Sequence, residues 1–191
     1  TPLPERLWTI KETSEFLSIP VGTLYQWHHR GEGPKPYKVG KHLRYDPRAV
    51  ARQLHRKGIY VIGRVVVFQD PYLARLRPDL AIRTRGGAVW ETSAGLAWLN
   101  PYDRRVWDYA VSVAAAAARA GFDEIMLDYV RFPSDGDTGA AVYPGRTRVP
   151  RGEQIAAFVA YAKQRLAPNL PRLPPDPRPW QQRRHRRPQH P

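Results

Sequence analysis

Several polar and ionisable side chains lie together at the end of one apolar segment of the chain. Asp128 ends a predicted buried strand, and Tyr129, Arg131 and Asp135 come just after it. A carboxylate can act as a nucleophile, a general base or an electrostatic stabiliser, depending on the neighbours that set its charge. This part of the chain is therefore the first candidate for chemistry, and the elements around it must explain how it is positioned.

The strand that ends at Asp128 belongs to a predicted α/β region that covers residues 58–167. GIYVIGRVVVF is a nearly continuous β-branched run, which is typical of a strand buried on both faces. Asn100 and Pro101 are predicted to start a long helix that ends at Gly121, and the strand EIMLDYV follows it. The order strand, helix, strand predicts parallel βαβ connectivity. A last amphipathic helix is expected over residues 152–166.

The sequence from GIYVIGRVVVF through GLAWLNPYDRRVWDYA to DEIMLDYVRFPSDG is similar to a bacterial family of glycoside-hydrolase-like proteins with a (β/α)8 barrel. The similarity covers residues 58–140. Active sites of such barrels lie at the carboxyl ends of the strands. The resemblance implies that Asp128 is the nucleophile or the carboxylate that stabilises the transition state. It also implies that Arg131 orients Asp128 and lowers its pKa.

A second carboxyl group, which glycoside hydrolysis normally requires, is not evident in the sequence. Asp70 ends the first strand but is expected mainly to cap a helix that begins at Pro71. Asp123 and Glu124 precede the second strand and should face its opposite end. The sequence predicts no metal site and no cofactor.

The length of this region predicts an incomplete barrel, because a whole barrel takes about 250 residues. Half a barrel leaves an open sheet edge and an exposed apolar face, through which copies of the chain could self-associate.

Residues 1–57 are predicted to form two short helices, a basic hairpin and a third helix. Thr9 and Glu12 have the spacing of a capping box at the start of the first helix. Asp46 before Pro47 predicts the start of the third helix. Two short helices joined by a tight turn form a helix-turn-helix unit.

The segments IKETSEFL, IPVGTLYQWHHRG, YKVG and LRYDP follow one another in this region. Together they resemble the excisionase-type, MerR-related family of winged helix-turn-helix domains, over residues 5–57. The resemblance implies double-stranded DNA as the partner, with the second helix in the major groove and the hairpin on phosphates or in the minor groove. The residues implied to contact DNA are Thr23, Gln26, His29, Arg30, Lys38, Lys41 and Arg44.

The net charge of +14 is concentrated near the two ends of the chain. Residues 1–57 carry 11 basic and 5 acidic side chains, residues 58–167 carry 14 and 11, and residues 168–191 carry 6 and 1. The last segment is rich in proline and arginine and is expected to be a disordered tail. The chain has no cysteine, and no apolar run reaches the roughly 18 residues of a membrane span. A cytoplasmic protein without membrane contact is expected.

Three functional hypotheses follow from these observations. The first is a DNA-binding protein of the excisionase or transcription-regulator type that carries a truncated hydrolase-like segment. The alternative is a carbohydrate-active glycoside hydrolase, with Asp128 as the catalytic carboxylate. The third is a nonspecific polyanion binder that acts through the arginine-rich tail.

Overall fold

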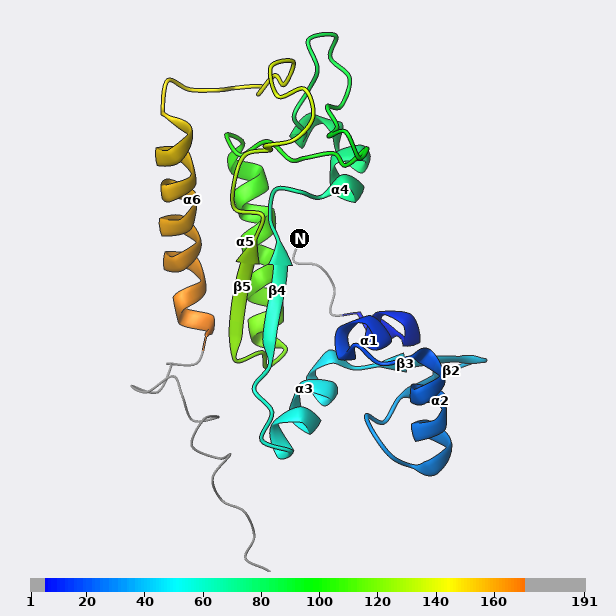
Figure 1. Ribbon diagram of the computed structural model, residues 1–191. Helices are drawn as coiled ribbons and strands as arrows, with labels where there is room; N and C mark the ends of the chain where they lie inside the picture. Colours follow the sequence, from blue (N-terminus) through cyan, green and yellow to red (C-terminus); the bar gives the residue numbers. More distant parts are fainter. Residues whose placement is uncertain (1–5, 171–191) are drawn as a thin grey trace, which may run out of the picture.

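The computed structural model describes residues 6–170, with helices and two small sheets (Figure 1). The predicted disordered tail falls outside the described residues from residue 171 onward. In chain order the elements are β1 (Trp8–Thr9), α1 (Ile10–Leu17), α2 (Val21–Arg30), β2 (Tyr37–Val39), β3 (His42–Tyr45), α3 (Pro47–Arg56), β4 (Ile62–Val66), α4 (Pro71–Leu76), α5 (Arg104–Arg119), β5 (Glu124–Asp128) and α6 (Arg151–Leu166), with 3-10 turns at Pro78–Leu80 and Ala167–Asn169.

The first six elements form a small N-terminal unit, residues 6–57, around its own hydrophobic cluster. Its antiparallel sheet has the strand order β1-β3-β2. The predicted capping box is confirmed, because the Thr9 hydroxyl accepts from the Glu12 N–H at 3.2 Å and the Glu12 carboxylate accepts from the Thr9 N–H at 2.7 Å. Asp46 caps α3 by accepting from the Arg48 N–H at 2.9 Å. The buried residues of the cluster are Leu24, Leu43, Tyr45 and Val50.

β4 and β5 form a parallel pair, as predicted, and the chain between them contains α4 and the long helix α5. Figure 1 shows α5 behind the two strands and α6 beside it. Val65 of β4, Trp107 of α5 and Phe158 of α6 are buried in the larger hydrophobic cluster that joins these layers. The structure is therefore mixed α/β with a parallel strand pair.

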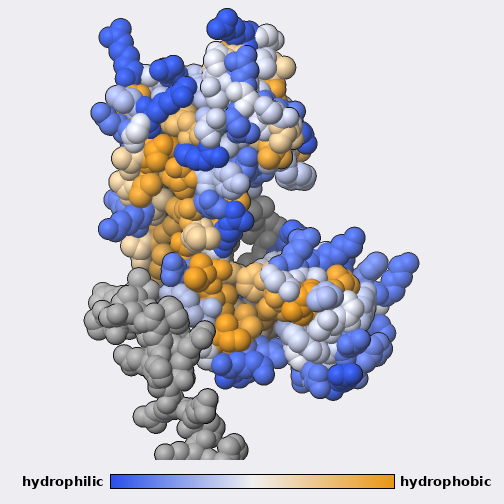
Figure 2. Space-filling view, viewed as in Figure 1, coloured by the Kyte–Doolittle hydropathy of each residue, from blue (hydrophilic) through white to orange (hydrophobic). Residues whose placement is uncertain are grey.

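The prediction that the first strand is buried on both faces is wrong. Side chains alternate along β4, so that Gly63 and Val65 are buried while Ile62 is 48% and Val66 is 37% exposed. Met126 of β5 is 45% exposed on the same face of the sheet. Figure 2 shows hydrophobic side chains gathered over the strands on the face turned away from α5. Within residues 6–170, no helix covers this face, on which Ile62, Val66 and Met126 lie beside the charged side chains of Arg64 and Asp128. Self-association through it stays a prediction.

The long helix begins at Arg104 and not at Asn100. Asp103 is its cap, since its carboxylate accepts from the Arg105 N–H at 2.9 Å. Asn100 is buried and has another role: its amide donates to the Pro144 carbonyl at 2.7 Å and so ties two loops together. Neither α5 nor any other helix within residues 6–170 has the length and hydropathy needed to cross a membrane.

The N-terminal unit packs against the amino-terminal ends of the parallel strands. Ala51 of α3 is buried where Gly121 approaches it, and the His55 ring lies 2.8 Å from the Asp123 carboxylate, just before β5. The rings of Phe16 and Phe122 also meet, with centroids 5.3 Å apart. The carboxyl-terminal ends of β4 and β5 point toward the long loops at the top of Figure 1.

Candidate active site

Asp128 is the last residue of β5 and lies opposite Val66, the last residue of β4. The Val67 N–H donates to the Asp128 carbonyl at 2.9 Å, which extends the strand pairing by one residue. The Asp128 side chain is 35% exposed. Because both strands run in the same direction, this carboxylate lies at the edge of the sheet that the N-terminal unit does not cover.

Two groups bind the two oxygens of the Asp128 carboxylate. The Arg64 guanidinium donates to Oδ2, with its Nε at 2.6 Å, and forms an ion pair with it. The Tyr129 N–H donates to Oδ1 at 2.7 Å. Tyr129 has a φ of 53°, in the left-handed region that residues other than glycine seldom adopt. Such conformations are often found at functional sites, where the surrounding structure holds them in place.

These contacts keep Asp128 ionised. The hydrogen bond from the Tyr129 N–H and then the Arg64 guanidinium lower the pKa of Asp128 below its usual value of 3.8, against a smaller opposing effect of burial. The positive charge of Arg131 adds a further small lowering of this pKa. An ionised carboxylate can attack or stabilise a developing positive charge, whereas a general acid needs a raised pKa.

Arg131 does not contact the Asp128 carboxylate, although the sequence suggested that it would orient Asp128. Its guanidinium donates to the Phe132 carbonyl at 3.1 Å and to the Ser134 hydroxyl at 2.8 Å. It also lies over the rings of Trp98 and Tyr129, 5.1 and 5.6 Å from their centroids. Arg131 is therefore a fixed cation near Asp128, and the residue that orients the carboxylate is Arg64.

Sequence reasoning missed Arg64, although a usable signal was present. Side chains alternate along a strand, so Arg64 shares a face of β4 with Val66. Once β4 and β5 are paired at their carboxyl ends, that face brings Arg64 beside Asp128. The sequence contains the alternation but not the register between the strands, so it does not by itself pair Arg64 with Asp128.

No second carboxylate contacts Asp128 within residues 6–170. Asp70 caps α4 as predicted, accepting from the Leu73 N–H at 2.9 Å, and its other oxygen faces the Tyr109 hydroxyl at 3.5 Å. Asp123 lies at the opposite end of β5, where it accepts from the Val61 N–H at 2.8 Å. In the same part of the chain, no group of three histidine, aspartate or glutamate side chains could hold a metal ion.

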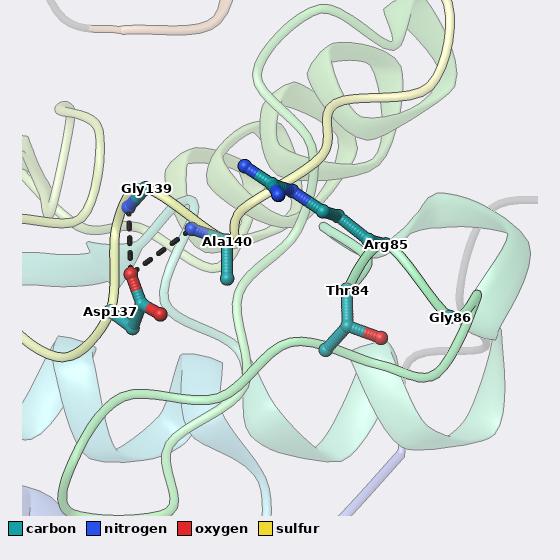
Figure 3. Close-up of a pocket in the computed structure, with 6 residues that line it drawn as sticks. All are labelled: Thr84, Arg85, Gly86, Asp137, Gly139 and Ala140. Carbon is teal, nitrogen blue, oxygen red and sulfur yellow. Dashed lines mark hydrogen bonds between the residues drawn. The ribbon is translucent and has the colours of Figure 1, made fainter.

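A groove opens between two of the loops that follow the strands (Figure 3). Its volume is about 490 Å³, and one wall comes from the chain after β4 while the other comes from the chain after β5. The residues that line it are Thr84, Arg85, Gly86, Asp137, Gly139 and Ala140.

The polar residues assigned to DNA lie on the N-terminal unit, away from these loops. Gln26, His29 and Arg30 are exposed on α2 and Thr23 is half-buried, whereas Lys38 and Lys41 are exposed on the hairpin of β2 and β3. Arg44 is half-buried and donates to the Leu43 carbonyl at 3.1 Å. The structure thus gathers none of them near Asp128.

Solved structures similar to this chain include a protein of Ruminiclostridium thermocellum ATCC 27405 described as hypothetical. It is 36% identical, with a TM-score of 0.57 over 64% of this chain and 62% of that chain. The chain thus spans 62% of the length of that relative. Weaker similarities are to an α-galactosidase of Thermus thermophilus (19% identity, 62% of this chain, 24% of that chain, TM-score 0.44) and to α-L-fucosidase isoenzyme 2 of Paenibacillus thiaminolyticus (18%, 70%, 22%, 0.44). No curated protein sequence matches the chain.

A family described as "Putative glycosyl hydrolase domain" matches residues 22–171. This match corrects the prediction of an excisionase-type, helix-turn-helix DNA-binding protein, because it begins inside α2 and includes most of the segment assigned to DNA. No comparison supports a winged helix-turn-helix domain. The segments behind that prediction encode capped helices, a tight turn and a hairpin, which any small α/β unit can use. The residues to which that prediction assigns a DNA contact are Thr23, Gln26, His29, Arg30, Lys38, Lys41 and Arg44, and no comparison supports a DNA partner for them. By the match over residues 22–171, the chain belongs to the family of glycosyl hydrolase domains that this description names.

Proposed function

We propose that residues 58–167 form a carbohydrate-active unit of the glycoside hydrolase type, with Asp128 as its ionised carboxylate. The observation that carries the proposal is the geometry of Asp128 at the carboxyl end of β5, where the Tyr129 N–H and the Arg64 guanidinium hold both oxygens. Membership of a glycosyl hydrolase family supports it, as does the usual place of barrel active sites at this end of the strands.

The charge of Asp128 suits one half of glycoside hydrolysis. The reaction passes through a transition state in which the sugar ring carries positive charge like an oxocarbenium ion. An ionised carboxylate next to the anomeric carbon can form a bond to it or stabilise its charge. Arg64 and Tyr129 would hold the Asp128 oxygens in a fixed orientation while keeping the pKa of this group low.

The other half of the reaction requires a carboxyl group that donates a proton to the leaving oxygen. We take Asp135 as the candidate to test, because it is the first carboxyl residue in the chain after Asp128 and lies exposed on the loop that follows β5. In retaining enzymes the two carboxyl groups lie about 5 Å apart, and in inverting enzymes about 6.5 to 9.5 Å.

The proposal is tested by measuring the reducing sugar that the full chain releases from a panel of oligosaccharides. Asp128→Asn should lower the rate by at least about 100-fold, since a positioned catalytic carboxyl contributes about that much or more. Asp135→Asn should also lower it. Glu32→Gln, at an exposed carboxylate of the N-terminal unit, is the matched control and should leave the rate unchanged. Equal rates for the Asp128→Asn variant and the unmodified chain would overturn the proposal.

A further inference from the structure

The groove between residues 84–86 and 137–140 has walls that are fixed by hydrogen bonds. The Trp90 indole N–H donates to the Asp137 carbonyl at 2.9 Å, which ties one wall to the other. Arg83 and Val142 exchange two backbone hydrogen bonds of 2.9 and 2.7 Å just outside the groove. A groove held in this way loses little conformational freedom when a ligand enters it, which favours binding.

The cation in this groove, Arg85, has no partner among the described residues. Arg85 is exposed and forms no hydrogen bond or ion pair with any residue between 6 and 170. Figure 3 shows its guanidinium extending across the groove toward the loop that contains Ala140. Three other arginines nearby are neutralised by carboxylates: the pairs are Arg75 with Glu91, Arg77 with Asp79, and Arg105 with Asp103. Arg83 instead donates to the Gly87 carbonyl at 2.7 Å.

One oxygen of the carboxylate in the groove, that of Asp137, already accepts hydrogen bonds. Asp137 Oδ1 accepts from the N–H groups of Gly139 and Ala140, both at 3.1 Å (Figure 3). These two backbone donors shape the loop and offset part of its negative charge. Arg85 and the Thr84 hydroxyl are thus the groups in the groove that remain available to a ligand, with Asp137 as an opposing charge.

A continuous set of contacts connects the groove to the residue after Asp128. The Tyr129 ring packs edge-on against Trp98, with centroids 5.9 Å apart. The Trp98 carbonyl accepts from the Ile82 N–H, and the Ile82 carbonyl accepts from the Trp90 N–H, each at 2.9 Å. Trp90 in turn holds Asp137.

Arg131 places a second cation on the same set of contacts. It lies over the Trp98 ring and, within the described residues, is paired with no carboxylate. Arg131 near Asp128 and Arg85 in the groove thus belong to one loop framework, and neither has a counter-ion among the described residues.

We propose that the groove binds a uronate unit of an acidic oligosaccharide, with the carboxylate of that sugar on Arg85. Guanidinium is the side-chain group that best matches a carboxylate, because it can donate two parallel hydrogen bonds. This inference rests on the proposed function, since it takes the glycan bound in the groove to be the one whose glycosidic bond lies at Asp128. It names the substrate class of that site as glycans that carry a carboxylate.

The test measures binding by calorimetry with the full chain carrying Asp128→Asn, so that the glycan is not cleaved. The ligands are oligomers of galacturonate, glucuronate and mannuronate, each compared with its carboxyl-reduced neutral counterpart. At least one acidic oligomer should bind about tenfold more tightly than its neutral counterpart, which corresponds to about 1.4 kcal/mol. Arg85→Gln should remove this preference. Asp137→Asn should increase it, because the opposing charge is lost.

Arg119→Gln is the matched control, since Arg119 is exposed in the last turn of α5, outside the loops that line the groove. It should leave the preference for the acidic oligomer unchanged. The inference is overturned if no acidic oligomer binds, if acidic and neutral oligomers bind equally, or if Arg85→Gln has no more effect than Arg119→Gln. Circular dichroism of each variant confirms that it is folded.

The binding and hydrolysis experiments together distinguish a failure of this inference from a failure of the proposed function. Hydrolysis of neutral glycans that depends on Asp128, without any acidic preference, overturns the inference alone. A preference for acidic glycans that depends on Arg85 supports the inference. If the unmodified chain then hydrolyses nothing, the proposed hydrolysis is contradicted.

Discussion

At Asp128, neighbours from two strands of the sheet set the charge of a single carboxylate. The Tyr129 N–H comes from the next residue in the chain, whereas the Arg64 guanidinium comes from β4, 64 residues away. Both favour the ionised form and lower the pKa of Asp128. The local backbone and the strand pairing therefore both determine what this side chain can do.

Arg64→Gln should raise the pKa of Asp128 toward its ordinary value, because the positive charge and one hydrogen bond are lost. The pKa is measured by following the carboxyl carbon of Asp128 by NMR as the pH is lowered. Arg131→Gln should raise the same pKa by less, since Arg131 acts only through its charge. If catalysis depends on the ionised form, the acid limb of the activity profile moves to higher pH in Arg64→Gln.

The lowered pKa of Asp128 also makes the stability of the folded chain depend on pH. A carboxyl group whose pKa is lower in the folded chain than in the unfolded chain stabilises the fold at pH values above its unfolded pKa. This stabilisation is lost as the pH falls through the folded pKa. Arg64→Gln should therefore shrink the acid-dependent loss of stability. An unchanged Asp128 pKa in Arg64→Gln would contradict the assignment of Arg64 as the orienting residue.

The sequence predicts the role of a residue when its partners are near neighbours in the chain. The partner of Arg64 is far away in the chain, so its role could not be predicted. The caps Thr9, Asp46 and Asp70 were all recognised, because a cap and the N–H groups it accepts from lie within three residues. Arg64 reaches Asp128 only through the register between two strands, which a single sequence does not contain.

Strand β4 requires a small residue at position 63, where the strand faces the core. A Cβ added at Gly63 would lie 2.8 Å from Cδ1 of Phe122 and 3.1 Å from Cδ1 of Ile125. The absence of a side chain lets β4 approach Phe122, which precedes β5, and Ile125 of β5. The sheet edge that carries Asp128 depends on this close packing.

Gly63→Ala should lower the free energy of unfolding by about 1 to 3 kcal/mol, the usual cost of forcing an extra carbon into a packed core. Gly22→Ala is the matched control, because an added Cβ there meets nothing within 4 Å and lies on helix α2. It should be neutral or stabilise by up to about 1 kcal/mol. Urea denaturation of both variants measures the difference. Equal stabilities would show that the packing around Gly63 gives way without cost.

The types of the elements could be predicted where the local sequence pattern was strong. The burial of their side chains could not. The parallel order of the two strands and the last helix were predicted close to where they lie. The apolar run of β4 predicted burial on both faces, yet Ile62 is 48% exposed. Burial of a strand depends on what packs over the sheet, and that is a property of the assembled layers.

At the scale of the whole molecule, the two ends of the parallel strands have different surroundings. The N-terminal unit packs at the amino-terminal ends through contacts such as Phe16 with Phe122 and His55 with Asp123. The carboxyl-terminal ends carry Asp128 and the loops of the groove (Figure 1). The loops that line the groove are thus spatially separate from the surface of α2 and the hairpin.

Of the functional hypotheses from the sequence, the family match supports the glycoside hydrolase alternative and not the DNA-binding one, which rests on a shorter local pattern. The helix-turn-helix resemblance covered residues 5–57, whereas the family match covers residues 22–171 and includes the strands and loops around Asp128. Short capped helices and a basic hairpin follow from local chemistry that many folds share. Membership of the family concerns most of the chain, which is why it corrects the prediction.

The most direct test of the central claim is where a carbohydrate binds on the chain. NMR titration of the ¹⁵N-labelled Asp128→Asn variant with the oligosaccharide panel reports this residue by residue. We expect the largest shifts at the Tyr129 N–H and the Trp98 indole, at the carboxyl ends of β4 and β5. Shifts confined to residues 6–57, or no shifts with any oligosaccharide, would contradict a carbohydrate site at Asp128.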